Sequence, residues 1–128
     1  YMYGPSSWAV NANFDDPVYG KTGDFVSAIE ENYDYTPDYH SAAGEAVILT
    51  YMNAFQNVDE LGPTAVRDQI RQAEFSTVYG TVAFDDSGVI DKNMLVYQWQ
   101  PDSGLQITYP ENVAQSEPMY PMPDWSER

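Results

Sequence analysis

Cysteine is absent from this 128-residue sequence, and histidine occurs only once. Without cysteine the protein has no disulfide scaffold, no thiolate nucleophile and no zinc site of the usual sulfur type. The sequence also contains neither a Gly-x-Ser-x-Gly nucleophile motif nor a phosphate-binding glycine loop. We therefore expect no catalytic residue, no metal site and no cofactor, which predicts that the protein is not an enzyme.

Basic residues are scarce as well. Five Lys and Arg residues face twenty Asp and Glu residues, which gives a formal net charge of -15. A surface of this charge repels nucleic acid and anionic membranes, so we expect neither as a partner. The excess of acidic residues is typical of proteins from salty environments, which suggests a marine or salt-adapted origin.

Long hydrophobic runs are also missing. No segment reaches the roughly 20 apolar residues that a membrane-spanning helix needs. The opening, Tyr1 to Pro5, has no initiating Met and resembles the middle of a strand. We therefore expect a mature product or a fragment whose beginning lies elsewhere.

Apolar residues recur with a helical period in the first part of the chain. One helix is predicted from an N-cap at Asp24 to Tyr33, and a second over residues 39–55, where small apolar residues favour close packing on a sheet. A third begins at Pro63, a residue suited to the first helical position, and continues to about Ala73. Its two arginines, Arg67 and Arg71, are expected on the outer face.

The period changes to two after about residue 75. Residues 79–84 and 94–99 are predicted to be strands, and residues 85–88 form a turn signal. Residues 105–109 alternate apolar and polar side chains and are expected to form a hairpin with the strand before them. The predicted fold class is therefore α/β, with helices packed on a small sheet, a C-terminal hairpin and an extended Pro-rich tail over residues 110–128.

Six segments in this order carry a family resemblance, namely residues 25–33, 36–43, 66–70, 79–88, 96–99 and 120–125. Together they resemble the C-terminal part of a type I periplasmic solute-binding protein of ABC transporters, in the branched-chain amino acid (Leu/Ile/Val-binding) family. The resemblance spans nearly the whole chain.

The resemblance implies a partial clamshell fold of the periplasmic-binding-protein-like type I class. In such proteins two lobes close on a small ligand, and the chain crosses between them three times. Residues 1–93 would belong to the N-terminal-type lobe after the second crossing, and the segment near residues 4–8 would follow that crossing. Residues 94–109 would return to the other lobe, with the third crossing near Met94. The N-terminal segment, which makes most contacts with the ligand in this family, is absent from this chain.

The function implied by the resemblance is binding of amino acids or similar small polar solutes for an ABC importer. The expected partners are a small solute such as an amino acid or amide and the membrane subunits of the transporter, and the expected location is periplasmic or extracytoplasmic. A half-built clamshell also predicts self-association of the fragment. Two other functions stay open: a small acid-base enzyme that uses His40 and a carboxylate, and a freestanding interaction module.

Three residues are candidate ligand contacts. Tyr39 and His40 open the second predicted helix, where family members place a residue that faces the cleft between the lobes. Trp8 follows the presumed hinge and could form a wall of the ligand pocket. Each has a structural alternative, because a lone histidine often caps a helix and a tryptophan often anchors a loop.

Residues 85–91 contain three aspartates and a serine, which raises the alternative of a calcium site. The EF-hand spacing requires a liganding Asp or Asn before the glycine and a Glu six residues after it, but Ser87 and Met94 occupy these positions. We expect a β-turn here instead, because turns favour Asp, Ser and Gly.

Overall fold

The computed structural model describes residues 1–127 and divides the chain into two compact units. One unit comprises Tyr1–Ser7 and Asn93–Arg128, and the other comprises Trp8–Lys92. The chain passes from one unit to the other after Ser7 and returns after Lys92. The boundary that the sequence predicts after residue 93 lies one residue beyond the second passage. The opening residues group with the C-terminal part of the chain and not with the residues that follow them.

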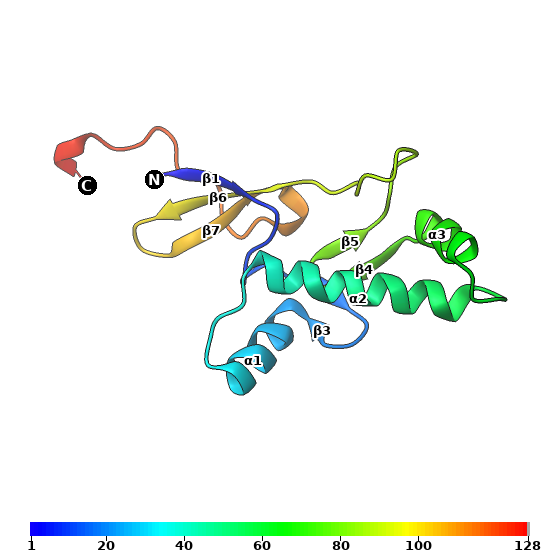
Figure 1. Ribbon diagram of the computed structural model, residues 1–128. Helices are drawn as coiled ribbons and strands as arrows, with labels where there is room; N and C mark the ends of the chain where they lie inside the picture. The colour runs from blue at the N-terminus through cyan, green and yellow to red at the C-terminus, as the bar shows by residue number, and fades with distance from the viewer. Residues whose placement is uncertain (128) are drawn as a thin grey trace. The chain divides into compact units, whose positions relative to one another are not determined.

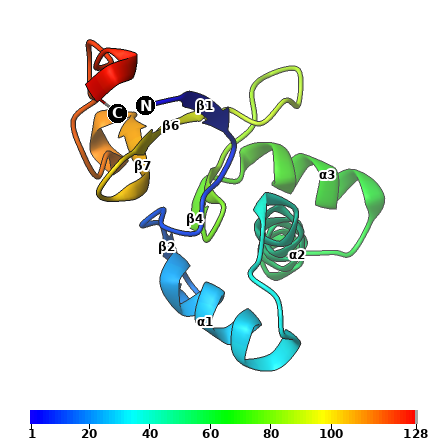
Figure 2. The same cartoon turned by 90° about the vertical axis from the view of Figure 1, so that its left-hand side faces the viewer.

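Three helices lie in the Trp8–Lys92 unit: α1 (Thr22–Tyr33), α2 (Tyr39–Asn57) and α3 (Pro63–Gln72). Seen end-on in Figure 2, α2 lies between α1 and α3. The prediction of Asp24 as an N-cap is wrong, because α1 begins at Thr22 with Lys21 at the N-cap. Asp24 lies instead in the first turn, where a negative charge interacts favourably with the helix dipole.

The start and the buried face of α2 follow from its sequence. The Asp38 carboxylate accepts hydrogen bonds from the backbone N–H groups of His40 and Ser41, at 2.9 and 3.2 Å. These two donors would otherwise lack an intrahelical partner. Three of the buried residues of α2 are alanines, so the backbone lies close to its neighbours. They are Ala42, Ala46 and Ala54.

Two short antiparallel ladders complete this unit. β2 (Asp15–Asp16) pairs with β3 (Gly20–Lys21), and β4 (Phe75–Thr77) pairs with β5 (Gly80–Val82) beside α2 (Figure 1). The strand predicted over residues 79–84 is therefore shorter than expected. The predicted turn that follows is confirmed, because the Gly88 N–H donates to the Asp85 carbonyl oxygen at 2.9 Å.

The core of this unit forms around Trp8, Phe25, Ala42 and Val78. The Phe25 ring meets the Trp8 ring edge-on, with the centroids 6.3 Å apart. The Trp8 side chain also donates a hydrogen bond from Nε1 to the Val78 carbonyl oxygen at 2.8 Å. This core joins α1, α2 and the β4–β5 hairpin to the start of the unit.

The other unit contains a three-stranded antiparallel sheet. β6 (Leu95–Gln100) lies between β1 (Tyr3–Ser6) and β7 (Gly104–Tyr109), as Figure 2 shows. The predicted hairpin is thus confirmed. Residues after β7 contain two 3-10 turns, η1 (Glu111–Val113) and η2 (Trp125–Glu127), so the tail is not extended throughout.

The protein is therefore a small mixed α/β structure with three helices and small antiparallel sheets. The α/β class predicted from the sequence is confirmed. Within residues 1–127, none of the helices combines the length and hydropathy that crossing a membrane requires.

Candidate functional site

The structure places Trp8 in the core rather than at a pocket wall. Its side chain is 3% exposed, and its indole N–H binds the Val78 carbonyl. The buried aromatic body and the satisfied N–H both anchor the chain where it enters the Trp8–Lys92 unit. This position fits the structural alternative that the sequence offered for Trp8, namely that it anchors a loop.

Tyr39 and His40 lie together at the exposed start of α2. Their ring centroids are 3.8 Å apart, and Tyr39 is 44% exposed. His40 Nδ1 lies 3.3 Å from the Asp38 carboxylate. The backbone hydrogen bond from Ser41, followed by the contact with His40, lowers the pKa of Asp38 below its usual value. The pair is exposed, whereas Trp8 is buried.

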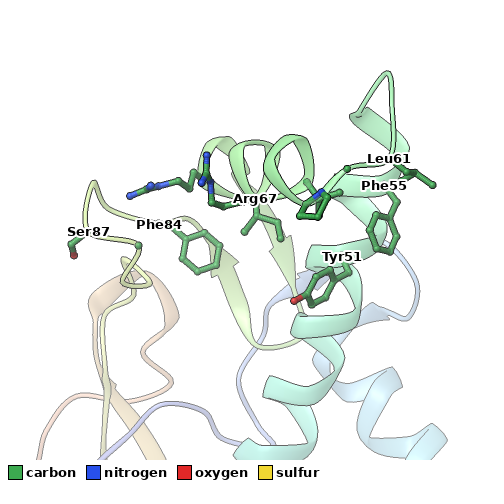
Figure 3. A pocket seen from close by; sticks show the side chains of 12 residues that line it. Tyr51, Phe55, Leu61, Arg67, Phe84 and Ser87 are labelled. Atoms are coloured by element: carbon green, nitrogen blue, oxygen red, sulfur yellow. The ribbon is translucent and has the colours of Figure 1, made fainter.

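A hollow in the Trp8–Lys92 unit forms a groove between α2, α3 and the turn that follows β5. It has a volume of about 920 Å³, within the range of small-molecule sites. Figure 3 shows Phe84 on one side of this α2–α3 groove and Tyr51 and Phe55 of α2 on the other. The remaining lining residues are Leu61, Gly62, Pro63, Val66, Arg67, Ile70, Arg71, Ser87 and Gly88.

Two arginines supply the charge of the α2–α3 groove. Arg71 Nη2 donates to the backbone carbonyl of Asp86 at 2.7 Å, across to the turn. Arg67 donates from Nε and Nη2 to the carboxylate of its neighbour Asp68, at 2.9 and 2.7 Å. The sequence predicts an outer-face position for both arginines and no site. The sequence nevertheless holds a pattern that could have indicated this groove. Arg67 and Arg71 each directly follow an apolar residue of the same helix, Val66 and Ile70.

A second cavity lies between α1 and α2. It has a volume of about 480 Å³ and a largely apolar lining that includes Glu45, Tyr35 and Ser41. Both carboxyl oxygens of Glu45 are shut off from solvent, and the Asp16 carboxylate lies close enough to interact with them. Burial, followed by the negative charge of Asp16, raises the pKa of Glu45 to about 8. Glu45 is therefore largely protonated near neutral pH.

The neighbouring Asp16 accepts hydrogen bonds from three backbone N–H groups. Its Oδ1 accepts from the N–H groups of Val18 and Tyr19, each at 2.8 Å, and its Oδ2 accepts from the Val78 N–H at 2.9 Å. This carboxylate therefore ties the β2–β3 turn to the β4–β5 turn. Sequence analysis missed both carboxyl groups, because they lie 29 positions apart along the chain.

Lys92 is the last residue of this unit, and its ammonium group lies against aromatic rings. Its Nζ is 3.3 Å from the centroid of the Tyr79 ring and 5.6 Å from that of Phe14. The same ammonium group donates to the Tyr79 carbonyl oxygen. Burial lowers the pKa of Lys92 to about 8. The contacts fix the chain at the point where it leaves the unit.

The aspartates after β5 form a turn. The Asp85 carboxylate accepts from the Ser87 N–H, the Ser87 hydroxyl and the Val89 N–H, at 2.6 to 2.9 Å. These bonds, led by the one from the Ser87 hydroxyl, lower the pKa of Asp85. Over residues 1–127 there is no cluster of three or more His, Asp or Glu side chains that could hold a metal ion.

Neither the models of known protein families nor the solved structures contain a match to this chain.

Proposed function

We propose that this chain is part of an extracytoplasmic solute-binding protein that captures amino acids or similar small polar solutes for an ABC importer. The observation that carries the proposal is the position of the two chain passages, after Ser7 and after Lys92. The family resemblance implies a third crossing between lobes near Met94, and it implies that the segment near residues 4–8 follows the second crossing. The passage after Lys92 lies close to the third crossing that the resemblance implies, and this supports the proposal, although residues 1–7 group with the other unit.

The contacts at these passages support the same function. Trp8 is buried directly after the first passage, and Lys92 is held by Tyr79 directly before the second. Binding proteins that close on a ligand bend at a few residues between rigid bodies. Anchors beside each passage are what such a hinge requires, and they support the proposal.

Tyr39 and His40 are the proposed ligand contacts. Both side chains are exposed, and their rings form one surface at the N-terminus of α2. A tyrosine hydroxyl and an imidazole can bind the polar groups of an amino acid, while the rings cover its apolar part. Trp8 contributes to the site as an anchor of the adjoining chain, without touching the ligand.

The acid-base enzyme has less support than a binding protein. His40 does lie beside a carboxylate, that of Asp38. However, Asp38 already accepts two backbone hydrogen bonds as the cap of α2, and neither residue lines the two cavities described above. The pair therefore lacks a pocket that excludes water from a reaction.

Calorimetric titration of leucine, isoleucine, valine and a small-amide panel tests the proposal. The whole protein that contains this segment should bind one of these solutes with micromolar affinity and lose affinity on His40→Ala, whereas Tyr33→Ala, a change at an exposed site on α1, should not. The isolated chain should bind weakly or not at all, because it has one wall of the cleft. Failure of the whole protein to bind any of them would overturn the proposal.

A further inference from the structure

The α2–α3 groove combines an apolar floor with positive charge. Large apolar and aromatic side chains from α2, α3 and the segment after β5 line it, together with Leu61, and no described lining residue is an acid. The side chains from these three parts are Tyr51, Phe55, Val66, Ile70 and Phe84. Ligand sites commonly have this composition, with an apolar lining and a few polar groups that orient the ligand.

The charge of the groove is opposite to that of the chain. Twenty acidic residues outnumber five basic ones in the sequence, yet two of those five basic residues line this groove. An anion that approaches the protein is repelled by most of its surface, and this groove offers a local exception. The distribution favours a ligand that is both apolar and negatively charged.

The two arginines differ in how much charge they can offer. The Asp68 carboxylate partly neutralises Arg67, whereas Arg71 donates to a neutral backbone carbonyl. The contact that Arg71 makes therefore does not neutralise its guanidinium. Its planar set of donors also suits a carboxylate, which it can bind through two parallel hydrogen bonds.

We propose that the α2–α3 groove binds an amphipathic carboxylate, with an alkyl or aryl part on the apolar floor and the carboxylate at Arg71. Arg67 adds a weaker attraction from the preceding turn of α3. Phe84 and Phe55 contact the apolar part of the ligand from opposite sides of the groove. This site is separate from Tyr39 and His40, so it does not rest on the solute-binding function proposed above.

Three probes of equal chain length, octanoate, octanol and octylamine, test this site. Calorimetric titration into the full chain should show octanoate binding most tightly and octylamine least. Arg71→Gln should weaken octanoate binding about tenfold, because a charge-assisted hydrogen bond is lost. Arg67→Gln should weaken it less. Lys21→Gln removes the same charge from a residue outside the groove and should leave binding unchanged.

Several results would overturn the proposal. Equal affinity for octanoate and octanol would show an apolar groove without anion recognition, and octanoate binding that is unchanged in Arg71→Gln would locate the anion elsewhere. Circular dichroism of each variant verifies folding, and Phe84→Leu provides a second variant that should lower the affinity for all three probes. Loss of amino-acid binding on His40→Ala concerns the other site and leaves this result untouched.

Discussion

The ionised form of the Glu45 side chain destabilises the folded state. Its carboxyl oxygens are hidden from solvent beside the Asp16 carboxylate. Ionisation there places a second negative charge next to the first, without water to stabilise it. Folding therefore favours the protonated form of Glu45, whereas the unfolded chain loses this proton at an ordinary pKa of about 4.5.

The pH dependence of stability follows from this shift. Because the folded pKa of Glu45 is raised to about 8, its effect on stability is most favourable below about pH 4.5 and worsens as the pH rises toward 8. We predict that Glu45→Gln, which stays neutral, raises the free energy of unfolding at pH 8 by about 1–2 kcal/mol, after allowance for solvent screening. Urea denaturation between pH 4 and pH 9 measures this gain.

A matched control separates burial from net charge. Glu31→Gln removes the same charge from an exposed position on α1. It should relieve only the general repulsion within a chain of net charge -15. If the two variants gain equally at pH 8, or if the gain from Glu45→Gln does not grow between pH 4.5 and pH 8, the account of Glu45 is wrong.

At the scale of elements, α2 connects most features of its unit. Its first turn presents Tyr39 and His40, its middle holds Glu45, and its C-terminal half forms one side of the α2–α3 groove. Asp38 is the residue that fixes where this helix begins. A substitution of Asp38 is therefore expected to disturb the proposed ligand contacts, Tyr39 and His40, before the rest of the helix.

We predict that Asp38→Ala lowers the melting temperature and frays the first turn of α2, because two backbone N–H groups lose their acceptor. Asp38→Asn should retain most of the stability at neutral pH, since asparagine is an equally good N-cap. The pKa of Asp38 is lowered in the folded state, so the wild-type advantage from its charge is lost as the pH falls through that pKa. Thermal melts at pH 7 and pH 3 measure both effects; equal melting temperatures for Asp38→Ala and wild type at pH 7 would contradict them.

At the scale of the whole molecule, exposed apolar side chains favour self-association of the chain, whereas its net charge opposes it. Three large apolar side chains of α2 are exposed: Val47, Ile48 and Met52, at 54%, 60% and 45%. The last two also line the cavity between α1 and α2. Such a row favours contact with another polypeptide. The net charge of -15 repels a second copy of the chain at low ionic strength.

We predict that the chain is monomeric in dilute buffer and self-associates in about 1 M salt, where the screening length falls to about 3 Å. Ile48→Glu should prevent this association, because it places a charge within the apolar row. Val89→Glu adds the same charge at a site that is also exposed, 59%, but lies outside α2, and should have little effect. Sedimentation at several protein concentrations checks the prediction, and association of Ile48→Glu as strong as that of wild type would refute it.

Features that depend on a few neighbouring residues could be predicted from the sequence. Pro63 marked the start of α3, residues 85–88 marked a turn, and the β6–β7 hairpin followed from alternation and spacing. The exact cap of α1 was missed because Asp24 is also favourable inside the first turn. Local signals of this kind act over one turn of helix or one strand pair.

The positions of Trp8, Glu45 and the groove arginines were decided only by the tertiary structure. The sequence left open whether Trp8 forms a pocket wall. The structure decides this, because the indole N–H of Trp8 binds the Val78 carbonyl, 70 residues away in sequence. Nothing in the sequence distinguishes Glu45 from other helix residues, and only the folded structure places it beside Asp16. Burial, pKa and cavity lining depend on which distant segments meet, so composition and periodicity predicted the elements, while packing alone determined the chemistry between them.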